Sequence, residues 1–413
     1  MSAPFHRRVE LAVVLVAFVY LGWQTAYRAG LSREPGKVTH TDVFTFLEGA
    51  DALASGTSPF GLREREHGYP YVYPPLPAVV FLPLRGLGRV GAAIAWYLIS
   101  CGVFAAGVVS LRRALDQGDQ GEHRDDHPWL PLLLVALPLA SGLERGQLNP
   151  ALAGLVALGA AALVKKREAL SGAALAASVA LKATPVLALA ALVRRPRATA
   201  AAALALVFLL VLLPAPFLGL RGSVQANLAF ADQMGLRYLH DPASATLTEG
   251  VRDYAVSERE KNQSLLAVMH RTRLGTTSAY RPVALVLALI IIGGTLALIV
   301  SIPKDADPRR LVAGVGLGAS VLLVVAPIAW HWHHVVLYVP LVAIQRSRWL
   351  VLFAALEVLH FAWKDAQPFG PLALGTLLVL VLCGVCTRPK RVGDTKVPGE
   401  RTTVEGERSP AEG

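Results

Sequence analysis

The apolar residues of this chain arrive in long blocks separated by short polar or basic segments, and they do not alternate with polar residues. Blocks of this kind are typical of helices solvated by lipid. We expect membrane crossings at residues 11–28, 92–111, 130–140, 151–164, 170–181, 186–193, 198–217, 282–302, 311–327, 335–344, 349–362 and 372–385. The pattern therefore predicts an all-α integral membrane protein with about 12 crossings. Several blocks are shorter than the roughly 20 residues of a free spanning helix, so some crossings should be paired half-length helices.

Composition supports a membrane protein and argues against a nucleic-acid partner. Mean hydropathy is +0.48, with 54% apolar and 17% charged residues, values that a soluble chain of this length would not show. The net charge of +11 comes from basic residues in small groups between the apolar blocks. Such groups are typical of cytoplasmic loops under the positive-inside rule. Cys101, Cys383 and Cys386 lie in apolar segments and are interpreted as core residues, not as a disulfide framework.

The basic groups also set the orientation and the domain boundaries. Placing them inside predicts both termini in the cytoplasm. The first apolar block has the charge pattern of a signal peptide, but no small-residue cleavage site follows it, which favours an uncleaved spanning helix. We expect one membrane domain over residues 1–386, with a first outer loop at 31–75 and a long outer loop at 218–280. Residues 387–413 have the composition of a disordered cytoplasmic tail.

This orientation brings the unusual polar residues to one face. The segments concerned are Asp42, residues 69–75, residues 144–149, Lys182, residues 262–264 and residues 331–334. Polar residues at membrane depth are costly and usually functional. Their common placement on the outer face indicates one shared site.

The same segments carry a family resemblance. Asp42-Val-Phe-Thr-Phe, Ser58-Pro-Phe60 and Tyr73-Pro-Pro75 follow one another in the first outer loop, and Gly146-Gln-Leu-Asn149 and Lys182-Ala-Thr-Pro185 come later. In this order they resemble glycosyltransferase family 87, a GT-C class family of polyprenyl-phosphate-mannose-dependent enzymes that includes phosphatidylinositol mannoside mannosyltransferases. Phe60 stands where many relatives have tyrosine. The resemblance implies a GT-C helical bundle with helices in its extracytoplasmic loops.

Asp42 is the candidate catalytic base. Removing the proton of an acceptor hydroxyl requires a base, and a carboxylate serves at neutral pH. The resemblance assigns this role to Asp42. Taken alone, the residue could equally cap an interfacial helix that begins at Val43. Tyr73, in the aromatic cluster of the same loop, is a candidate for sugar or acceptor binding.

Lys182 is the candidate ligand of the donor phosphate. A lysine at a helix end often snorkels to the interface. This one, however, faces outward against the positive-inside trend and precedes a proline break. An ammonium placed there suits the phosphate of a lipid-linked sugar.

Amide side chains supply candidate sugar ligands. Gln147 and Asn149 can bond sugar hydroxyls, although Asn149 before Pro150 could also cap a helix. Asn262 and Gln263 resemble the family's asparagine-glutamine-serine segment, and a helix cap by Asn262 or Ser264 is the alternative. Arg271, further along this segment, is a candidate phosphate contact.

The segment Trp330-His-Trp-His-His334 holds three of the chain's 11 histidines. It resembles a family pattern of tryptophan and paired histidines, and Ala329 replaces the usual serine. His333 fits the pattern in either alignment and is the catalytic candidate, with His334 as a phosphate ligand. Trp330 suits sugar stacking, and interfacial anchoring is the alternative. Zinc is disfavoured because adjacent histidines cannot easily surround one ion, so no metal or cofactor is expected.

Two function classes follow. The favoured one is an inverting glycosyltransferase that moves a sugar, with mannose preferred, from a polyprenyl-phosphate donor to a glycolipid or glycan acceptor on the extracytoplasmic face. The alternative is a transporter or flippase of a lipid-linked glycan. Transporters usually carry internal repeats and midplane charges. No repeat is visible here, and the polar residues gather at one face.

Overall fold

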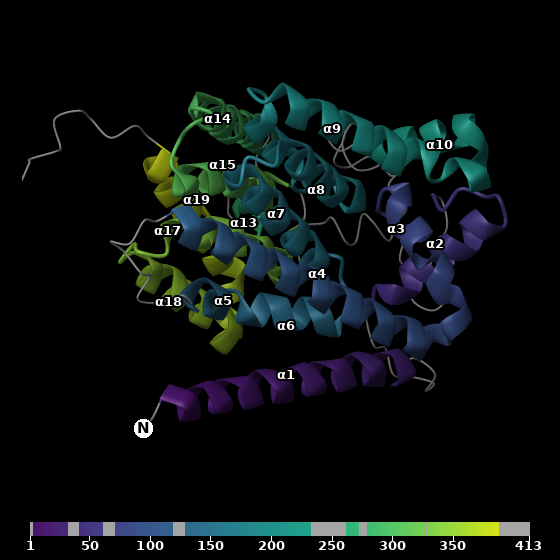
Figure 1. Ribbon diagram of the computed structural model, residues 1–413, viewed down its shortest axis with the longest axis horizontal. Helices are drawn as coiled ribbons and strands as arrows, with labels where there is room; N and C mark the ends of the chain where they lie inside the picture. The colour runs from purple at the N-terminus through teal and green to yellow at the C-terminus, as the bar shows by residue number, and fades with distance from the viewer. Residues whose placement is uncertain are drawn as a thin grey trace, which may run out of the picture.

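The computed structural model describes residues 3–31, 41–60, 71–118, 129–232, 262–271, 279–326 and 329–387. Every regular element within these ranges is a helix, as the hydropathy pattern predicts (Figure 1). The first nine are α1 (Ala3–Leu31), α2 (Val43–Ala54), α3 (Pro75–Phe81), η1 (Leu82–Leu87), α4 (Gly88–Gly118), α5 (Leu130–Leu134), α6 (Ala136–Glu144), α7 (Asn149–Val164) and α8 (Glu168–Leu181). They are followed by η2 (Val186–Leu192), α9 (Pro196–Val207), η3 (Phe208–Leu212), α10 (Ala215–Ala231), α13 (Leu265–Arg271) and α14 (Tyr280–Ser301). The last are α15 (Pro308–Ser320), α16 (Leu322–Val325), η6 (His331–Leu337), α17 (Tyr338–Ile344), α18 (Leu350–Ala362), η7 (Lys364–Phe369) and α19 (Pro371–Thr387).

Helix α7 forms the centre of the bundle. It is apolar on all sides, and all but a few of its residues are buried, as expected for a helix surrounded by others. Helices α4, α8 and α15 pack around it (Figure 1). Gly107 of α4 and Gly154 of α7 meet so closely that a Cβ on Gly107 would lie 2.3 Å from the carbonyl oxygen of Gly154. Small residues of this kind let membrane helices approach backbone to backbone.

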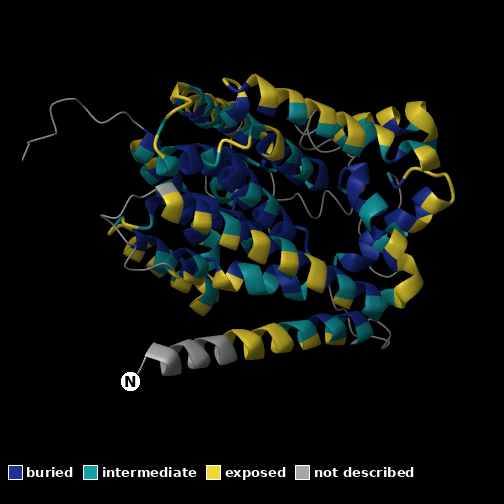
Figure 2. Ribbon diagram, in the orientation of Figure 1, coloured by how far each residue is buried: buried dark blue, intermediate teal, exposed yellow. Residues whose placement is uncertain are grey.

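The outer helices expose apolar side chains, as a lipid-facing surface requires. Figure 2 shows exposed residues along α9, α10 and α14, and in α14 they include Val286, Leu289 and Ile290. A soluble protein rarely exposes a continuous apolar surface of this size. Among the described residues, three helical stretches are long and apolar enough to cross a membrane, or four if one bent pair is counted as a span. Five shorter apolar helices accompany them, and the number of crossings stays a prediction.

Two segments differ in detail from the expected pattern. The short apolar run at residues 79–84 lies between prolines and glycines, a pattern that favours a separate juxtamembrane or re-entrant piece. In the structure it belongs to a helical stretch from Pro75 to Gln117. The outer loop expected at residues 218–280 begins as helix, since α10 continues to Ala231 after a bend of 109° from the preceding helix. The predicted tail lies beyond Thr387, outside the described residues.

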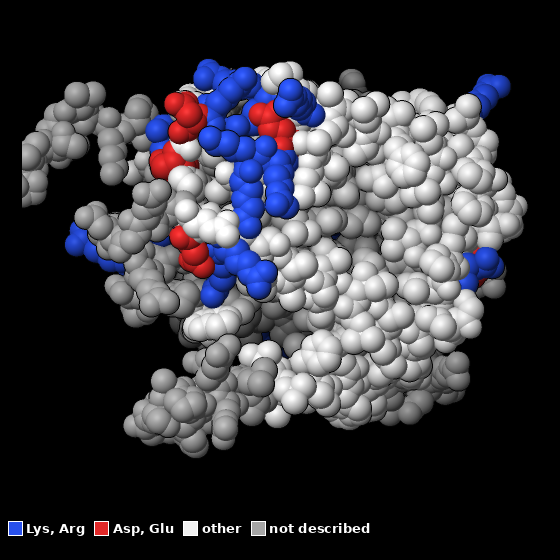
Figure 3. All heavy atoms as spheres, viewed as in Figure 1, with Lys and Arg blue, Asp and Glu red and all other residues white. Residues whose placement is uncertain are grey.

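Charged residues gather at one end of the bundle. Figure 3 shows lysine and arginine side chains at the left end of the molecule and few charges elsewhere on this face. This basic end is formed by three segments: the one between α7 and α8, the one just before α9 and the one just before α15. Asn149 begins α7, whose 16 residues rise about 24 Å to its other end. The polar residues around Asn149 are thus separated from the basic end by most of a bilayer's hydrocarbon thickness, about 30 Å.

A smaller aromatic core holds the segment around Tyr71 and Tyr73 in place. It joins α2, α3 and the beginning of α4, and Phe46 contacts the rings of Tyr73 and Phe81 at centroid distances of 4.8 and 4.9 Å. The Tyr71 ring occupies the space beside Gly49, where a Cβ would lie 2.6 Å from it. The Tyr71 hydroxyl donates to the carbonyl of Pro74 and accepts from the N–H of Ala78. These contacts fix the segment that carries Tyr73 against the helix that follows Asp42.

Candidate functional site

Asp42 lies at the beginning of α2 and does not cap it. The helix has no side-chain cap bond, and Asp42 Oδ2 accepts a 2.6 Å hydrogen bond from the Tyr73 hydroxyl. The capping alternative is therefore not what the structure shows. The hydroxyl of Tyr73, a residue predicted to bind sugar or acceptor, contacts the Asp42 carboxylate.

The backbone around Asp42 is tied to the loop before α7. The Asp42 N–H donates to the carbonyl of Arg145 at 3.0 Å, and the Thr41 hydroxyl donates to the same carbonyl at 3.2 Å. Gly146 has a φ of +63°, and a Cβ there would lie 2.3 Å from the Val43 side chain. This position requires glycine both for its left-handed backbone and for space. Two segments about a hundred residues apart in the sequence thus form one rigid edge of the site.

Lys182 extends the network from the other side. It follows the last residue of α8, and its Nζ donates to Asn149 Oδ1 at 3.2 Å. Asn149 Nδ2 donates to Gln147 Oε1 at 3.4 Å, and the Gln147 side chain lies close enough to the Asp42 carboxylate to lower its pKa. Asn149 does not cap α7, which has no side-chain cap. The amides thus connect the candidate base to the candidate phosphate ligand.

His333 completes the cluster. Its Nε2 lies 3.0 Å from Lys182 Nζ, and the ring is 9% exposed. Its Nδ1 accepts from the N–H of Trp330 at 3.3 Å, which assigns the ring proton to Nε2. Nε2–H and the lysine ammonium are then two donors facing each other. An anionic oxygen lying beside both would satisfy them, as an oxygen of a phosphate group can.

The other two histidines have different surroundings. His331 Nε2 lies 2.8 Å from the Ser141 hydroxyl. His334 is fully buried, and its Nδ1 bonds the carbonyl of Trp330 at 3.1 Å. His333 is therefore the histidine that meets Lys182, whereas the ring of His334, expected to bind phosphate, is held by backbone. Trp330 is buried and stacks on Trp332 at a centroid distance of 5.5 Å.

Glu144 and Arg145 contact residues of two different helices. Glu144 pairs with Arg28 at the end of α1. The Arg145 guanidinium lies over the Trp332 ring at 4.8 Å, a cation–π contact. The two neighbours connect α1 and η6 to the loop that holds Asp42.

The candidate residues Asn262, Gln263 and Arg271 form hydrogen bonds with the backbone of neighbouring segments. Asn262 Oδ1 accepts the backbone N–H groups of Ala329 and Ser264, and Gln263 Nε2 donates to the carbonyl of Gln367. The Ser264 hydroxyl accepts from Ala267 in the first turn of α13, so the capping alternative holds for this residue. Arg271 donates to the carbonyls of Pro368 and Asn262. These side chains hold the start of η6, and sugar or phosphate binding by Asn262, Gln263 and Arg271 stays a prediction.

Sequence reasoning overlooked two polar residues of α18. Glu357 and His360 are buried in this apolar helix, at 6% and 2% exposure, and the His360 ring lies 6.0 Å from that of His331. The available signal was their spacing of three residues, which puts both on one face of a helix. Ionisable residues on a helix expected to cross a membrane are a functional signal by themselves.

Burial shifts the pKa values of the two central groups, Asp42 and Lys182, in opposite directions. Desolvation raises the pKa of Asp42, and the Tyr73 hydrogen bond and the Lys182 charge oppose this shift. Desolvation lowers the pKa of Lys182 to about 8, against the attraction of Asp42. Lys182 thus loses its proton in mildly alkaline solution, and burial makes the charged form of each group less favourable than in water. Among the described residues, no group of three or more His, Cys, Asp or Glu side chains is placed to hold a metal ion.

Comparison with known proteins identifies the family. The model of glycosyltransferase family 87 matches residues 71–327, more than half of the chain. The chain belongs to glycosyltransferase family 87. Tyr73, Gln147, Asn149 and Lys182 lie inside the matched range, whereas Asp42 and His333 lie outside it.

A curated relative and a solved structure are similar over parts of their length. The relative is the polyprenol-phosphate-mannose-dependent alpha-(1-2)-phosphatidylinositol pentamannoside mannosyltransferase of Mycolicibacterium smegmatis, 28% identical over 193 residues. That match covers 45% of this chain and 44% of the relative. The crystal structure of ArnT from Cupriavidus metallidurans bound to undecaprenyl phosphate aligns with 91% of this chain and 78% of its own, at 14% identity and a TM-score of 0.39. At this level of similarity the GT-C arrangement stays a prediction.

Proposed function

We propose that this protein is an inverting glycosyltransferase that takes a sugar from a polyprenyl-phosphate donor. Family membership supports sugar transfer. The name of the M. smegmatis relative supports a polyprenyl-phosphate donor and mannose as the sugar. The acceptor class is a glycolipid or glycan hydroxyl. The observation that carries the proposal is the continuous set of contacts from Asp42 through Gln147 and Asn149 to Lys182 and His333.

The reaction is a single displacement in which each proton and bond is accounted for. The acceptor oxygen attacks the anomeric carbon while its proton passes to the Asp42 carboxylate. The bond from the anomeric carbon to the phosphate oxygen breaks, and polyprenyl phosphate leaves with an added negative charge. Lys182 and His333 stabilise that charge by donating to the phosphate oxygens. The leaving group needs no general acid, so one carboxylate suffices and the configuration inverts.

Tyr73 and the amides give the base its position. The Tyr73 hydroxyl occupies Asp42 Oδ2, which leaves the other carboxylate oxygen for an acceptor hydroxyl. Gln147 and Asn149 lie between the base and the ammonium, where the hydroxyls of a bound sugar would lie. Near-attack geometry requires reacting atoms about 3–3.5 Å apart, and a network this compact is consistent with that requirement.

The site is proposed to face the extracytoplasmic side of a bacterial cell membrane. The basic end lies at the opposite ends of α7 and α8, about 24 Å away by the rise of α7's 16 residues. Lysine and arginine are enriched on the cytoplasmic side. This separation supports the outer face for Asp42, Lys182 and His333.

The test is sugar transfer by the purified protein in detergent, with radiolabelled polyprenyl-phosphate mannose and membrane glycolipid as acceptor. We expect a labelled glycolipid whose new linkage has the anomeric configuration opposite to that of the donor. A transporter would instead move the lipid-linked sugar across proteoliposomes without breaking the sugar–phosphate bond. Movement of intact donor with no product would reject the proposal.

A further inference from the structure

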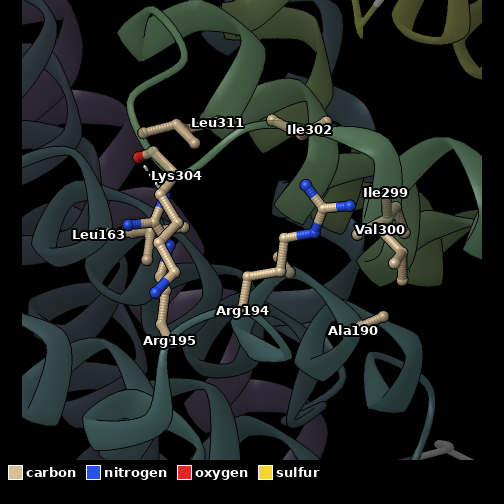
Figure 4. A pocket seen from close by; sticks show the side chains of 10 residues that line it. Leu163, Ala190, Arg194, Arg195, Ile299, Val300, Ile302, Lys304 and Leu311 are labelled. Carbon is tan, nitrogen blue, oxygen red and sulfur yellow. Dashed lines mark hydrogen bonds between the residues drawn. The ribbon is translucent and has the colours of Figure 1, made fainter.

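Two pockets that share Lys304 lie at the basic end, far from the candidate site, and the one between Arg194 and Arg195 is the candidate for ligand binding. It is lined by basic and apolar residues, namely Leu163, Ala190, Ala191, Arg194, Arg195, Ile299, Val300, Ile302, Lys304 and Leu311. Figure 4 shows Lys304 beside Arg195 on one side and Arg194 on the other, with Ile299 and Val300 of α14 next to Arg194 and with Ile302 and Leu311 at the top. The pocket therefore combines a cationic rim with an apolar wall.

The three cations of the rim are not equivalent. Arg195 is buried, and its NH2 donates to the carbonyl of Lys304 at 2.6 Å, which fixes the segment between α14 and α15. Arg194 and Lys304 are exposed, and neither has an ion-pair partner among the residues that the structure describes. Two unpaired cations around one hollow attract an anion with at least one negative oxygen.

An apolar stripe leads from the pocket along α14. It consists of Val286, Ile290, Gly293, Ala297 and Val300, spaced by four, three, four and three residues, and so lies on one helix face. Val300 lines the pocket, and the other four are exposed. The 14 steps of the stripe span about 21 Å. The small residues Gly293 and Ala297 leave room along it for an acyl chain.

We propose that this pocket binds the head group of an anionic phospholipid, with an acyl chain along the α14 stripe. A phosphodiester supplies the anionic oxygens for Arg194 and Lys304. The apolar wall and stripe distinguish a lipid from a soluble phosphate, which would gain nothing from them. Basic pockets between helices on the cytoplasmic side are suited to anionic head groups. The lipid would lie in the leaflet opposite the candidate site.

The experiment is native mass spectrometry of the full chain after exchange into mixed detergent–lipid micelles. The probes are phosphatidylglycerol, phosphatidylcholine, glycerol 3-phosphate and inorganic phosphate. We expect phosphatidylglycerol to be retained, and the other three to be retained at least tenfold less. Equal retention of glycerol 3-phosphate or inorganic phosphate would show a soluble-anion site and overturn the lipid assignment.

A pair of double variants tests the location. Arg194→Gln with Lys304→Gln removes the two unpaired cations and leaves Arg195 in place. Arg167→Gln with Arg197→Gln removes the same charge from exposed positions of the same end that do not line this pocket. We expect the first pair to weaken phosphatidylglycerol retention about 10- to 30-fold and the second to change it less than threefold. Equal losses would indicate diffuse surface attraction and reject the site.

The melting temperature tests whether the first double variant, Arg194→Gln with Lys304→Gln, still folds. The melting temperature without added lipid should match that of the wild type within the error of the scan. The increase in melting temperature on adding phosphatidylglycerol should be lost only in the first pair. An increase equal to that of the wild type would contradict the proposal.

Discussion

The two ends of α7 and α8 hold their charged residues in different ways. At the Asn149 end, Lys182 is in contact with an amide, a histidine and the face of the Tyr73 ring, the last at 5.7 Å. At the other end, Arg167 and Arg197 are exposed beside Lys304. Burial makes a charge sensitive to each neighbour, whereas exposed charges are screened. We therefore expect substitutions at the first end to affect chemistry, and those at the second to affect lipid contacts.

The largest effect should come from Asp42→Asn. The variant keeps the shape and the contact with Tyr73 but removes the proton acceptor, so transfer should fall about 10²–10⁴-fold. Asp51→Asn is the matched control, because Asp51 lies on the same helix in an exposed pair with Arg85. Its transfer rate should stay within about twofold of the wild type. Near-normal turnover of a folded Asp42→Asn protein would remove the base assignment.

Lys182→Ala should rank next. Without the ammonium, the leaving phosphate loses its cation, and kcat/KM for the lipid donor should fall about 10²–10³-fold. Lys165→Ala removes a lysine at the other end of α7 and should leave kcat/KM unchanged. If both variants behave alike, Lys182 is only an interfacial anchor.

Tyr73→Phe separates two roles of this tyrosine. The variant loses the 2.6 Å bond to Asp42 and keeps the ring. A hydrogen bond to a charged group contributes about 1.5–3 kcal/mol, so kcat should fall roughly 10- to 100-fold. Unchanged kcat would mean that the ring alone matters, as in sugar stacking.

The pH profile provides a smaller but diagnostic effect. Transfer requires Asp42 deprotonated and Lys182 protonated. Since burial lowers the pKa of Lys182 to about 8, kcat/KM should fall as the pH rises through that value. In Lys182→Arg the alkaline fall should disappear, because arginine keeps its charge. An alkaline limb that persists unchanged in Lys182→Arg would assign the titration to another group.

A chelator should have no effect. Transfer measured with excess EDTA should equal that of the untreated enzyme, because the proposed chemistry uses a carboxylate, an ammonium and an imidazole. Loss of activity that zinc restores would bring back a metal at the histidines.

The sequence predicted the grouping of the site better than the partners within it. Basic loops alone put Asp42, Lys182 and His333 on one face, and the structure brings them into one network. The order and direction of the helices determine which helix ends meet, and the hydropathy and charge patterns of the sequence indicate both. The sequence does not indicate which side chains bond each other, because the Tyr73 contact with Asp42 depends on aromatic packing in a separate small core.

Other features of the site and the fold cannot be derived from local sequence patterns. Arg271 donates to backbone carbonyls, and the Asn262 side chain accepts from backbone N–H groups; no sequence motif reveals either set of contacts. Glu357 and His360 lie on a helix without a motif, and although their spacing puts them on one helix face, only the structure shows that both are buried. The crossing count is equally hard to derive, because helices as short as α8, with 14 residues, depend on their neighbours to reach across the membrane.

The most direct test of the account is an experimental structure of the protein with bound polyprenyl phosphate. We predict density for the phosphate within hydrogen-bond distance of both Lys182 Nζ and His333 Nε2, with Asp42 across a gap of one sugar. The polyprenyl chain should leave toward lipid at the end of the bundle opposite the basic end. A phosphate bound at Arg271 or at the basic end, with Lys182 turned away from it, would contradict the proposed site.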